Sequence, residues 1–208
     1  MKTKWGIFFV LVFLVAFAGC TTKKGRTIMN IKHGIETETN SSVKYAAFAQ
    51  KAWEEGYDTI ARLYEAVSKA EAIHSSNHEA VLKTFLEEKE KFSPKFKVRS
   101  TIENLQETIA LEMYEANIMY PMFLKDAKSS RSIKQPVIQS LTWAHEIEKK
   151  HVEMFSQALE ALKTKTKYNL PFDYLICPVC GNIFDKTNVP DTCALCGVSK
   201  DFFIEIDQ

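Results

Sequence analysis

The chain has 208 residues, which is enough for one domain of medium size and a second, smaller one. Its 27 basic and 26 acidic side chains leave a net charge of +1, so there is no electrostatic basis for binding nucleic acid. Half of the 6 prolines follow Asn169, and the body of the chain contains few helix breakers. This uneven distribution predicts a helical body followed by a tail built from loops.

The first 19 residues have the composition of a secretory signal peptide. Lys2 and Lys4 precede an apolar run over residues 5–17, and small side chains follow at positions 18 and 19. This order of basic, apolar and small residues is typical of export signals. The run is also shorter than the ~20 apolar residues that a membrane-spanning helix needs. We therefore assign residues 1–19 to a signal peptide and exclude them from the fold.

A single cysteine, Cys20, follows this segment directly. Residues 17–20 resemble the cleavage site of bacterial lipoproteins, in which the cysteine is lipidated and becomes the mature N-terminus. We expect Cys20 to carry a lipid and residues 20–27 to form a polar tether. The protein would then be exported and anchored to a membrane at the periplasmic face or the cell surface. The alternatives are an uncleaved anchor or an ordinary signal peptide.

Residues 28–168 have the periodicity of amphipathic helices and are predicted to form a four-helix bundle, so the fold class is mainly α. The first helix is expected over about residues 28–54, the second begins near Asp58, and the third carries Ile102 on its apolar face. Steps of three and four place eight residues of the fourth helix on one face: Val137, Leu141, Ala144, Glu148, His151, Phe155, Leu159 and Leu162.

Three further residues of the bundle carry expectations that a structure can test. Pro121 is predicted to kink or loosen the third helix. His33 and His78 are expected near helix ends and in contact with solvent. Because His78 follows His74 by four residues, a second metal site formed by these two histidines is an alternative.

Every predicted helix places a glutamate where the core should be apolar: Glu38, Glu71, Glu112 and Glu148. One such residue is usually half-exposed, but four in register are not, since a buried unpaired carboxylate is costly. In the second and fourth helices a histidine, His74 or His151, follows the glutamate by three residues and is its neighbour on one helix face. The same donor set holds two iron or manganese ions in other helical bundles. We therefore predict a site for two metal ions, with Glu115 beside it.

The tail contains two C-x-x-C-G turns, formed by Cys177 and Cys180 and by Cys193 and Cys196. Two such turns can bring four thiolates into a tetrahedron around one metal ion. An exported protein could form disulfides instead, but the short loops would be strained. Zinc and iron both suit four thiolates. We expect iron, because an electron-carrying ion has a use beside a di-iron site, with zinc as the alternative.

These residues resemble those of the rubrerythrin family over nearly the whole mature chain. The matching segments include Glu112-Met-Tyr-Glu115, Met119-Tyr120-Pro121, Cys177-Pro-Val-Cys180-Gly and Cys196-Gly-Val-Ser-Lys200. The resemblance implies a ferritin-like four-helix bundle over residues 28–168, followed by a small rubredoxin-like domain with metal knuckles over residues 172–208. It also implies a peroxidase that reduces hydrogen peroxide to water and protects against oxidative stress.

The resemblance further implies a role for each residue of the bundle site. Glu71 and Glu148 would bridge the irons, Glu38 and Glu112 would be terminal ligands, and His151 would bind one iron. His74 and Glu115 would alternate on the other iron as its redox state changes. Glu115 would carry a proton while it is off the metal. Tyr45 and Tyr120 match two tyrosines near the family's site, although both could be ordinary core aromatics.

The expected partners follow from the same resemblance. They are hydrogen peroxide, an unidentified electron-donor protein, and a second copy of the chain in a homodimer. Export departs from the family's usual cytoplasmic location and leaves the identity of the donor open. The alternative functions are iron oxidation and handling, as in ferritins, and redox sensing by a membrane-tethered protein.

Overall fold

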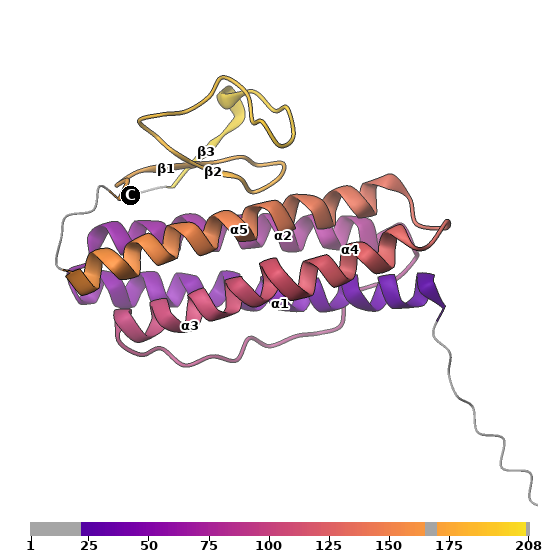
Figure 1. Ribbon diagram of the computed structural model, residues 1–208, viewed down its shortest axis with the longest axis horizontal. Helices are drawn as coiled ribbons and strands as arrows, with labels where there is room; N and C mark the ends of the chain where they lie inside the picture. The colour runs from indigo at the N-terminus through magenta and orange to yellow at the C-terminus, as the bar shows by residue number, and fades with distance from the viewer. Residues whose placement is uncertain (1–21, 165–169, 207–208) are drawn as a thin grey trace, which may run out of the picture.

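The computed structural model describes residues 22–164 and 170–206. Residues 1–19, Cys20 and the lipidation predicted there lie outside the described residues. Long helices form a bundle, and a small domain with a three-stranded sheet lies along one side of it (Figure 1). The predicted fold class, mainly α with a four-helix bundle and a small terminal domain, is therefore confirmed. Within the described ranges, no helix combines the length and apolar character needed to cross a membrane.

Helix α1 (Lys23–Glu54) starts about five residues before the start expected near residue 28, inside the segment of residues 20–27. The reason is a cap, because the Thr22 hydroxyl accepts a hydrogen bond from the Gly25 amide and satisfies a free donor of the first turn. Helix α1 ends at Glu54, and Gly56, with a φ of +77°, lets the chain reverse into α2 (Asp58–Lys83).

The third long segment consists of α3 (Thr101–Tyr114), a π-helical turn (Glu115–Met119) and α4 (Tyr120–Lys128). The irregularity expected near Pro121 takes the form of this π turn, which ends at Met119, two residues before the proline. A π turn has one extra residue and changes the direction of the side chains that follow. Helix α5 (Gln135–Thr164) completes the bundle.

The apolar face predicted for the third segment is shifted at its first residue, Ile102. Ile102 is 37% exposed, whereas Thr101, Asn104, Leu105 and Thr108 are buried. The buried Glu112 explains the shift, because positions four, seven, eight and eleven residues before it share its face of the helix. In this helix the buried Glu112, not Ile102, marks the face that points inward.

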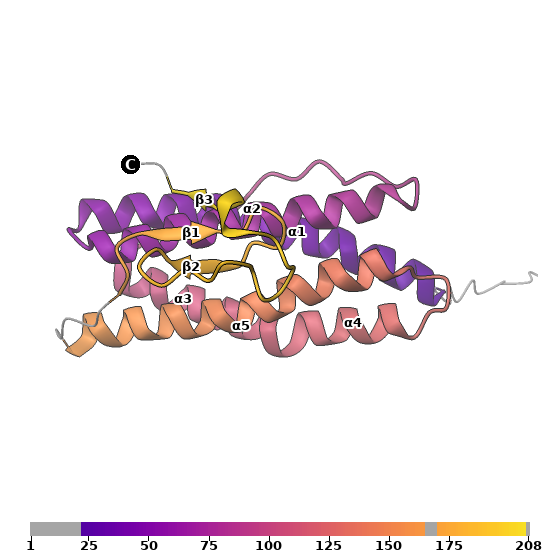
Figure 2. The ribbon, with the colours of Figure 1, turned by 90° about the horizontal axis from the view of Figure 1, so that it is seen from above.

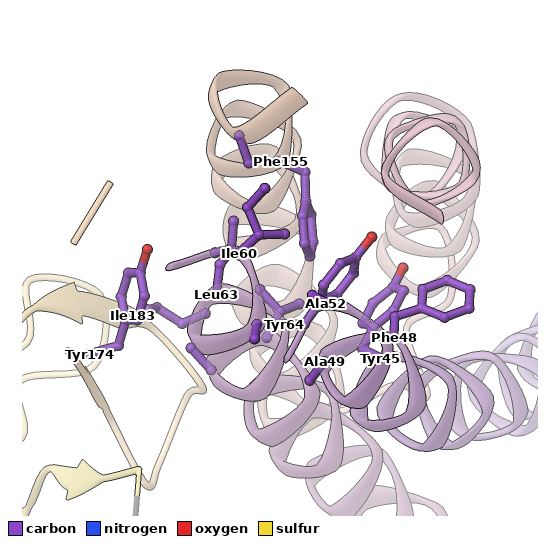
Figure 3. Packing of buried hydrophobic residues seen from close by; sticks show 14 of the residues in the cluster. Tyr45, Phe48, Ala49, Ala52, Ile60, Leu63, Tyr64, Phe155, Tyr174 and Ile183 are labelled. Atoms are coloured by element: carbon purple, nitrogen blue, oxygen red, sulfur yellow. The ribbon is translucent and has the colours of Figure 1, made fainter. Parts of the chain in front are cut away.

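The layer of glutamates and histidines lies between two apolar cores. One core includes Ile35 and Leu141, and the other includes Tyr45 and Phe155. Along α5 the sequence passes from the first core, through Glu148 and His151, to the second core. Figure 3 shows part of the second core, where aromatic rings of α1, α2 and α5 pack together. The site is therefore enclosed by apolar side chains at both ends.

The small domain contains β1 (Tyr174–Ile176), β2 (Ile183–Asp185) and β3 (Ile204–Glu205) in the antiparallel order β2-β1-β3. A short 3-10 helix (Lys200–Phe202) precedes β3. Tyr174 and Ile183 belong to the same apolar core as Leu63 of α2 and reach toward it in Figure 3. The domain thus lies over α2 and α5, as the view from above shows (Figure 2).

Candidate metal centre

Six predicted ligands of the bundle meet at its centre and form two groups of four. One group is Glu38, Glu71, His74 and Glu148, and the other is Glu71, Glu112, Glu148 and His151. Within each group the donor atoms lie within 4.8 Å of one another. Glu71 and Glu148 belong to both groups. These two carboxylates therefore occupy the position from which one side chain can bridge two metal ions.

The donor atoms have the spacing that a bound ion requires. His74 Nδ1 lies 2.9 Å from Glu71 Oε2 and 3.1 Å from Glu148 Oε1. His151 Nδ1 lies 2.9 Å from Glu148 Oε2 and 3.4 Å from an oxygen of Glu112. Two ligands at about 2.1 Å from one metal and at right angles to each other are about 3 Å apart. The residues present therefore fit two metal ions.

The electrostatics of the site also fit cations. Burial raises the pKa values of Glu38 and Glu112 well above the usual range, and the carboxylates of Glu71 and Glu148 raise them further. One oxygen of each of these four glutamates is buried without a hydrogen-bond partner. A buried oxygen without a partner is costly. Metal ions would neutralise the carboxylates and give these oxygens a partner.

The two shared glutamates differ from the terminal ones. Burial raises the pKa of Glu148, but the charge and hydrogen bond of His151 outweigh burial, and the net shift is downward. The pKa of Glu71 is lowered by the same histidine against the effects of burial and of Glu148. Glu71 and Glu148 thus favour the ionised form, which is the form that binds metal.

Glu115 occupies the first position of the π turn and stands apart from both groups of donors. Its side chain is fully buried, and neither carboxylate oxygen has a hydrogen-bond partner. Burial raises its pKa well above the usual range, and Glu112 and Glu148 add to this effect. His74, not Glu115, thus completes the first group. The exchange between these two residues on one iron stays a prediction.

Tyr45 and Tyr120 lie at opposite ends of the site. The Tyr45 hydroxyl donates a hydrogen bond to Glu112 Oε1, and the Tyr120 hydroxyl donates one to Glu38 Oε1. Both rings are fully buried. Each tyrosine therefore orients one terminal carboxylate. The alternative that both are ordinary core aromatics does not account for these hydrogen bonds.

The expectation that His78 contacts solvent was wrong, because α2 continues to Lys83 and His78 is fully buried. Its Nδ1 lies 2.7 Å from Ser140 Oγ, and its Nε2 lies 2.9 Å from the Tyr120 hydroxyl. His78 belongs to neither group of donors, so these contacts replace the alternative of a second metal site. Burial lowers its pKa to about 3, and the imidazole is neutral at physiological pH. The spacing from His74 could have predicted burial, since residues four apart share a helix face.

The four cysteines of the tail converge on one point. Cys177 Sγ lies 3.4 Å from Cys196 Sγ, and Cys180 Sγ lies 3.5 Å from Cys193 Sγ. All four are free thiols. A tetrahedral ion with bonds of 2.3 Å to sulfur separates its ligands by about 3.8 Å, so the cluster fits one metal ion. These four cysteines form no disulfide bond, so the disulfide alternative is wrong.

Glycines complete the two cysteine turns. Gly181 and Gly197 have φ values of +84° and +79°, and their amides donate to the carbonyls of Cys177 and Cys193. A residue with a side chain is strained in this left-handed conformation. The glycine that ends each C-x-x-C-G motif is therefore required by the turn that aims the two thiolates.

The tail site lies directly against a ligand of the bundle site. A Cβ atom added to Gly181 would be 2.8 Å from His74 Nε2, which is closer than real Cβ atoms approach other groups. Asn77, three residues after His74 on α2, donates from Nδ2 to the carbonyl of Val179 at 2.8 Å. The first cysteine turn and the predicted ligand His74 are thus in van der Waals contact. Sequence reasoning missed this contact, because no periodic pattern marks it.

Comparison with known proteins supports the same two kinds of metal site. The rubrerythrin family model matches residues 30–159, and the model for the rubredoxin-like domain of rubrerythrins matches residues 176–204. Rubrerythrin-2 of Clostridium acetobutylicum is 30% identical to this chain, over 88% of it and 98% of the relative. Nigerythrin of Nitratidesulfovibrio vulgaris is 32% identical over 89% of each chain.

Solved structures of nigerythrin share the fold. A mixed-valence state superposes with a TM-score of 0.76 at 30% identity, over 86% of each chain. A fully reduced, all-ferrous state gives a TM-score of 0.76 at 28% identity, over 99% of this chain and 100% of the other. The glutamate and histidine cluster is thus a di-iron site, and the cysteine cluster is a rubredoxin-like iron site. The chain belongs to the rubrerythrin family.

Proposed function

We propose that this protein is a peroxidase that reduces hydrogen peroxide to water, with electrons passed from the four-cysteine site to the di-iron site. The observation that carries the proposal is the contact between Gly181 and His74. It connects a site that can only carry electrons to a site that has exchangeable ligands. Four thiolates saturate a tetrahedral ion and leave no position for a substrate.

The reaction consumes one hydrogen peroxide, two protons and two electrons and releases two water molecules. The glutamates and histidines of the bundle would hold two irons, which would supply two electrons and a Lewis acid for the peroxide oxygens, and the four cysteines would hold an iron that can supply electrons singly. The six ligands fix this centre between two apolar cores, which keep bulk water out. Glu115 is suited to hold a proton beside the reacting oxygens, because its buried carboxyl has no other partner.

Iron storage is the competing function for a bundle of this kind. A storage protein oxidises Fe²⁺ and needs a path for iron, but it has no need of an electron supply. The docked cysteine site therefore favours reduction of an oxidant. We also propose that the protein is exported and lipidated at Cys20, which is supported by the basic, apolar and small residues that precede this cysteine.

The test replaces Cys177 and Cys196 by serine. We expect the variant to retain two irons in the bundle, and after chemical reduction to consume one peroxide per di-iron site in a single rapid turnover. Sustained turnover with an external donor should fall by at least tenfold, because the electron supply is lost. Stopped-flow absorbance followed by a steady-state assay separates the two measurements. A Cys20→Ser variant, which leaves the tail intact, is the control.

Three outcomes would count against the proposal. Loss of the single turnover while both bundle irons remain would show that the tail takes part in the peroxide chemistry. Steady turnover at the unmodified rate would show that the tail only supports the fold. Rapid oxidation of added Fe²⁺ with slow use of peroxide would favour iron handling.

A further inference from the structure

Lys150 of α5 points away from the bundle and into the cysteine domain. It is half-buried and directly precedes His151, a ligand of the di-iron site. Its ammonium donates to Asn182 Oδ1 at 3.0 Å and to the carbonyl of Ile183, and it lies 5.0 Å from the centre of the Phe184 ring. One turn of α5 therefore carries the predicted iron ligand His151 on one face and, on another face, the Lys150 ammonium that contacts the tail domain.

The contact with Lys150 determines the orientation of the Asn182 amide. A lysine ammonium has three donors and no acceptor, so the amide oxygen of Asn182 must face it. The amide nitrogen then points the other way, and it lies 3.8 Å from Cys193 Sγ. The backbone carbonyl of Asn182 also accepts a hydrogen bond from the amide of Cys177, which ties this residue to the other cysteine turn. Lys150, Asn182 and Cys193 thus form a chain of donors that ends on a thiolate.

We propose that Lys150 is a positioning residue that raises the reduction potential of the tail iron by fixing the Asn182 amide as a hydrogen-bond donor to Cys193. Reduction adds one negative charge to an ion already surrounded by four thiolates. A donor to sulfur and a nearby cation stabilise that charge, and both are known determinants of potential at such sites. The ammonium belongs to the bundle, so the tail has this potential only while it is docked.

This inference rests on the electron-carrying role proposed above, but it concerns a quantity that is measured without peroxide. The tail would accept an electron most readily when it is docked against His74, which is the position from which it can pass the electron on. Docking and electron uptake are therefore coupled through one side chain.

The test is the reduction potential of the tail iron in the full-length, iron-loaded protein, measured by spectroelectrochemistry of its visible absorbance. We expect Lys150→Met to lower the equilibrium constant for reduction by about tenfold, which is about 59 mV for a one-electron couple. The matched control is Lys149→Met, which removes the same charge from a side chain that is 46% exposed and paired with Glu146. It should shift the potential far less.

Two further variants test the route through Asn182. Asn182→Ala should lower the potential in the same direction, and the double variant with Lys150→Met should be no lower than Asn182→Ala alone, because coupled residues are not additive. Lys150→Arg, which retains charge and donors, should restore most of the potential. Equal shifts for Lys149→Met and Lys150→Met, or additive shifts in the double variant, would overturn the inference. The expected shifts in potential, found in a protein that does not reduce peroxide, would instead contradict the proposed function and leave this inference standing.

Discussion

The five buried glutamates of the bundle are chemically identical residues in three different environments. Glu71 and Glu148 lie among the histidines, Glu38 and Glu112 each accept a hydrogen bond from a tyrosine, and Glu115 has no partner. The sequence predicted which glutamates meet, because helical spacing places them on one face. It could not predict the contacts that distinguish them, since these join residues of different helices.

The shared position of Glu148 leads to a prediction about metal content. Glu148→Ala should lose both bundle irons, not one, because each group of donors loses a ligand and the remaining carboxylates are no longer balanced. The matched control is Glu146→Ala, two residues earlier on α5 with a side chain that is 45% exposed. Iron analysis of the purified variants distinguishes them. A Glu148→Ala protein that keeps two irons in the bundle would show that the ligand assignment is wrong.

At the scale of the helices, periodicity predicted the buried face of α5 correctly but misplaced Ile102 at the start of the third segment. Val137, Leu141 and Phe155 are buried as expected, because apolar residues set the phase of α5. In α3 the buried Glu112 marks the inward face, and Ile102 lies off that face. The π turn that carries Glu115 has no periodic signature, because its extra residue interrupts the spacing on which such predictions depend.

The buried titratable groups on these helices lead to a prediction of how the stability of the metal-free bundle depends on pH. Burial among carboxylates raises the pKa values of Glu38, Glu112 and Glu115, and contacts with Glu148 and Glu71 raise the pKa of His74 to about 9 despite burial. Between pH 5 and pH 9 the folded protein therefore keeps protons that the unfolded chain has released. Its stability falls as pH rises through this range. The metal-free protein should therefore be more stable at pH 5 than at pH 9, by about 1.4 kcal/mol per pH unit for each proton released.

Thermal unfolding of the chelated protein at a series of pH values checks this prediction. The iron-loaded protein is the control, and its stability should depend much less on pH because the ions replace the protons. Metal-free protein that is equally stable at pH 5 and pH 9 would show that the carboxylates are not buried together as the structure places them.

For the whole molecule, the two domains could be predicted but their contact could not. The cysteine spacing and the helical periods identify each domain separately. The contact depends on Asn77, Lys150 and Gly181. Their partners lie in the other domain, so the sequence of either domain alone does not show why these residues are needed. The homodimer implied by the family resemblance stays a prediction.

The predicted location of the molecule has a direct test. Mass spectrometry of the native protein should show a chain that begins at lipid-modified Cys20, and Cys20→Ser should release the protein from the membrane fraction. The physical reason is that residues 23–54 form a helix with a polar surface, so the lipid would be the anchor. A native chain that still begins with Met1 and is found in the cytosol would refute export.

The central claim is that the tail iron delivers electrons to the di-iron site through the contact at His74. The most direct test mixes the all-ferrous protein with excess hydrogen peroxide and follows the visible absorbance of the oxidised tail iron by stopped flow. We predict that this absorbance appears after oxidation of the bundle irons, at a rate that depends on neither protein nor peroxide concentration at saturation. A rate that rises in proportion to peroxide, and that survives in Glu148→Ala protein lacking the bundle irons, would mean that peroxide oxidises the tail directly and would contradict the account.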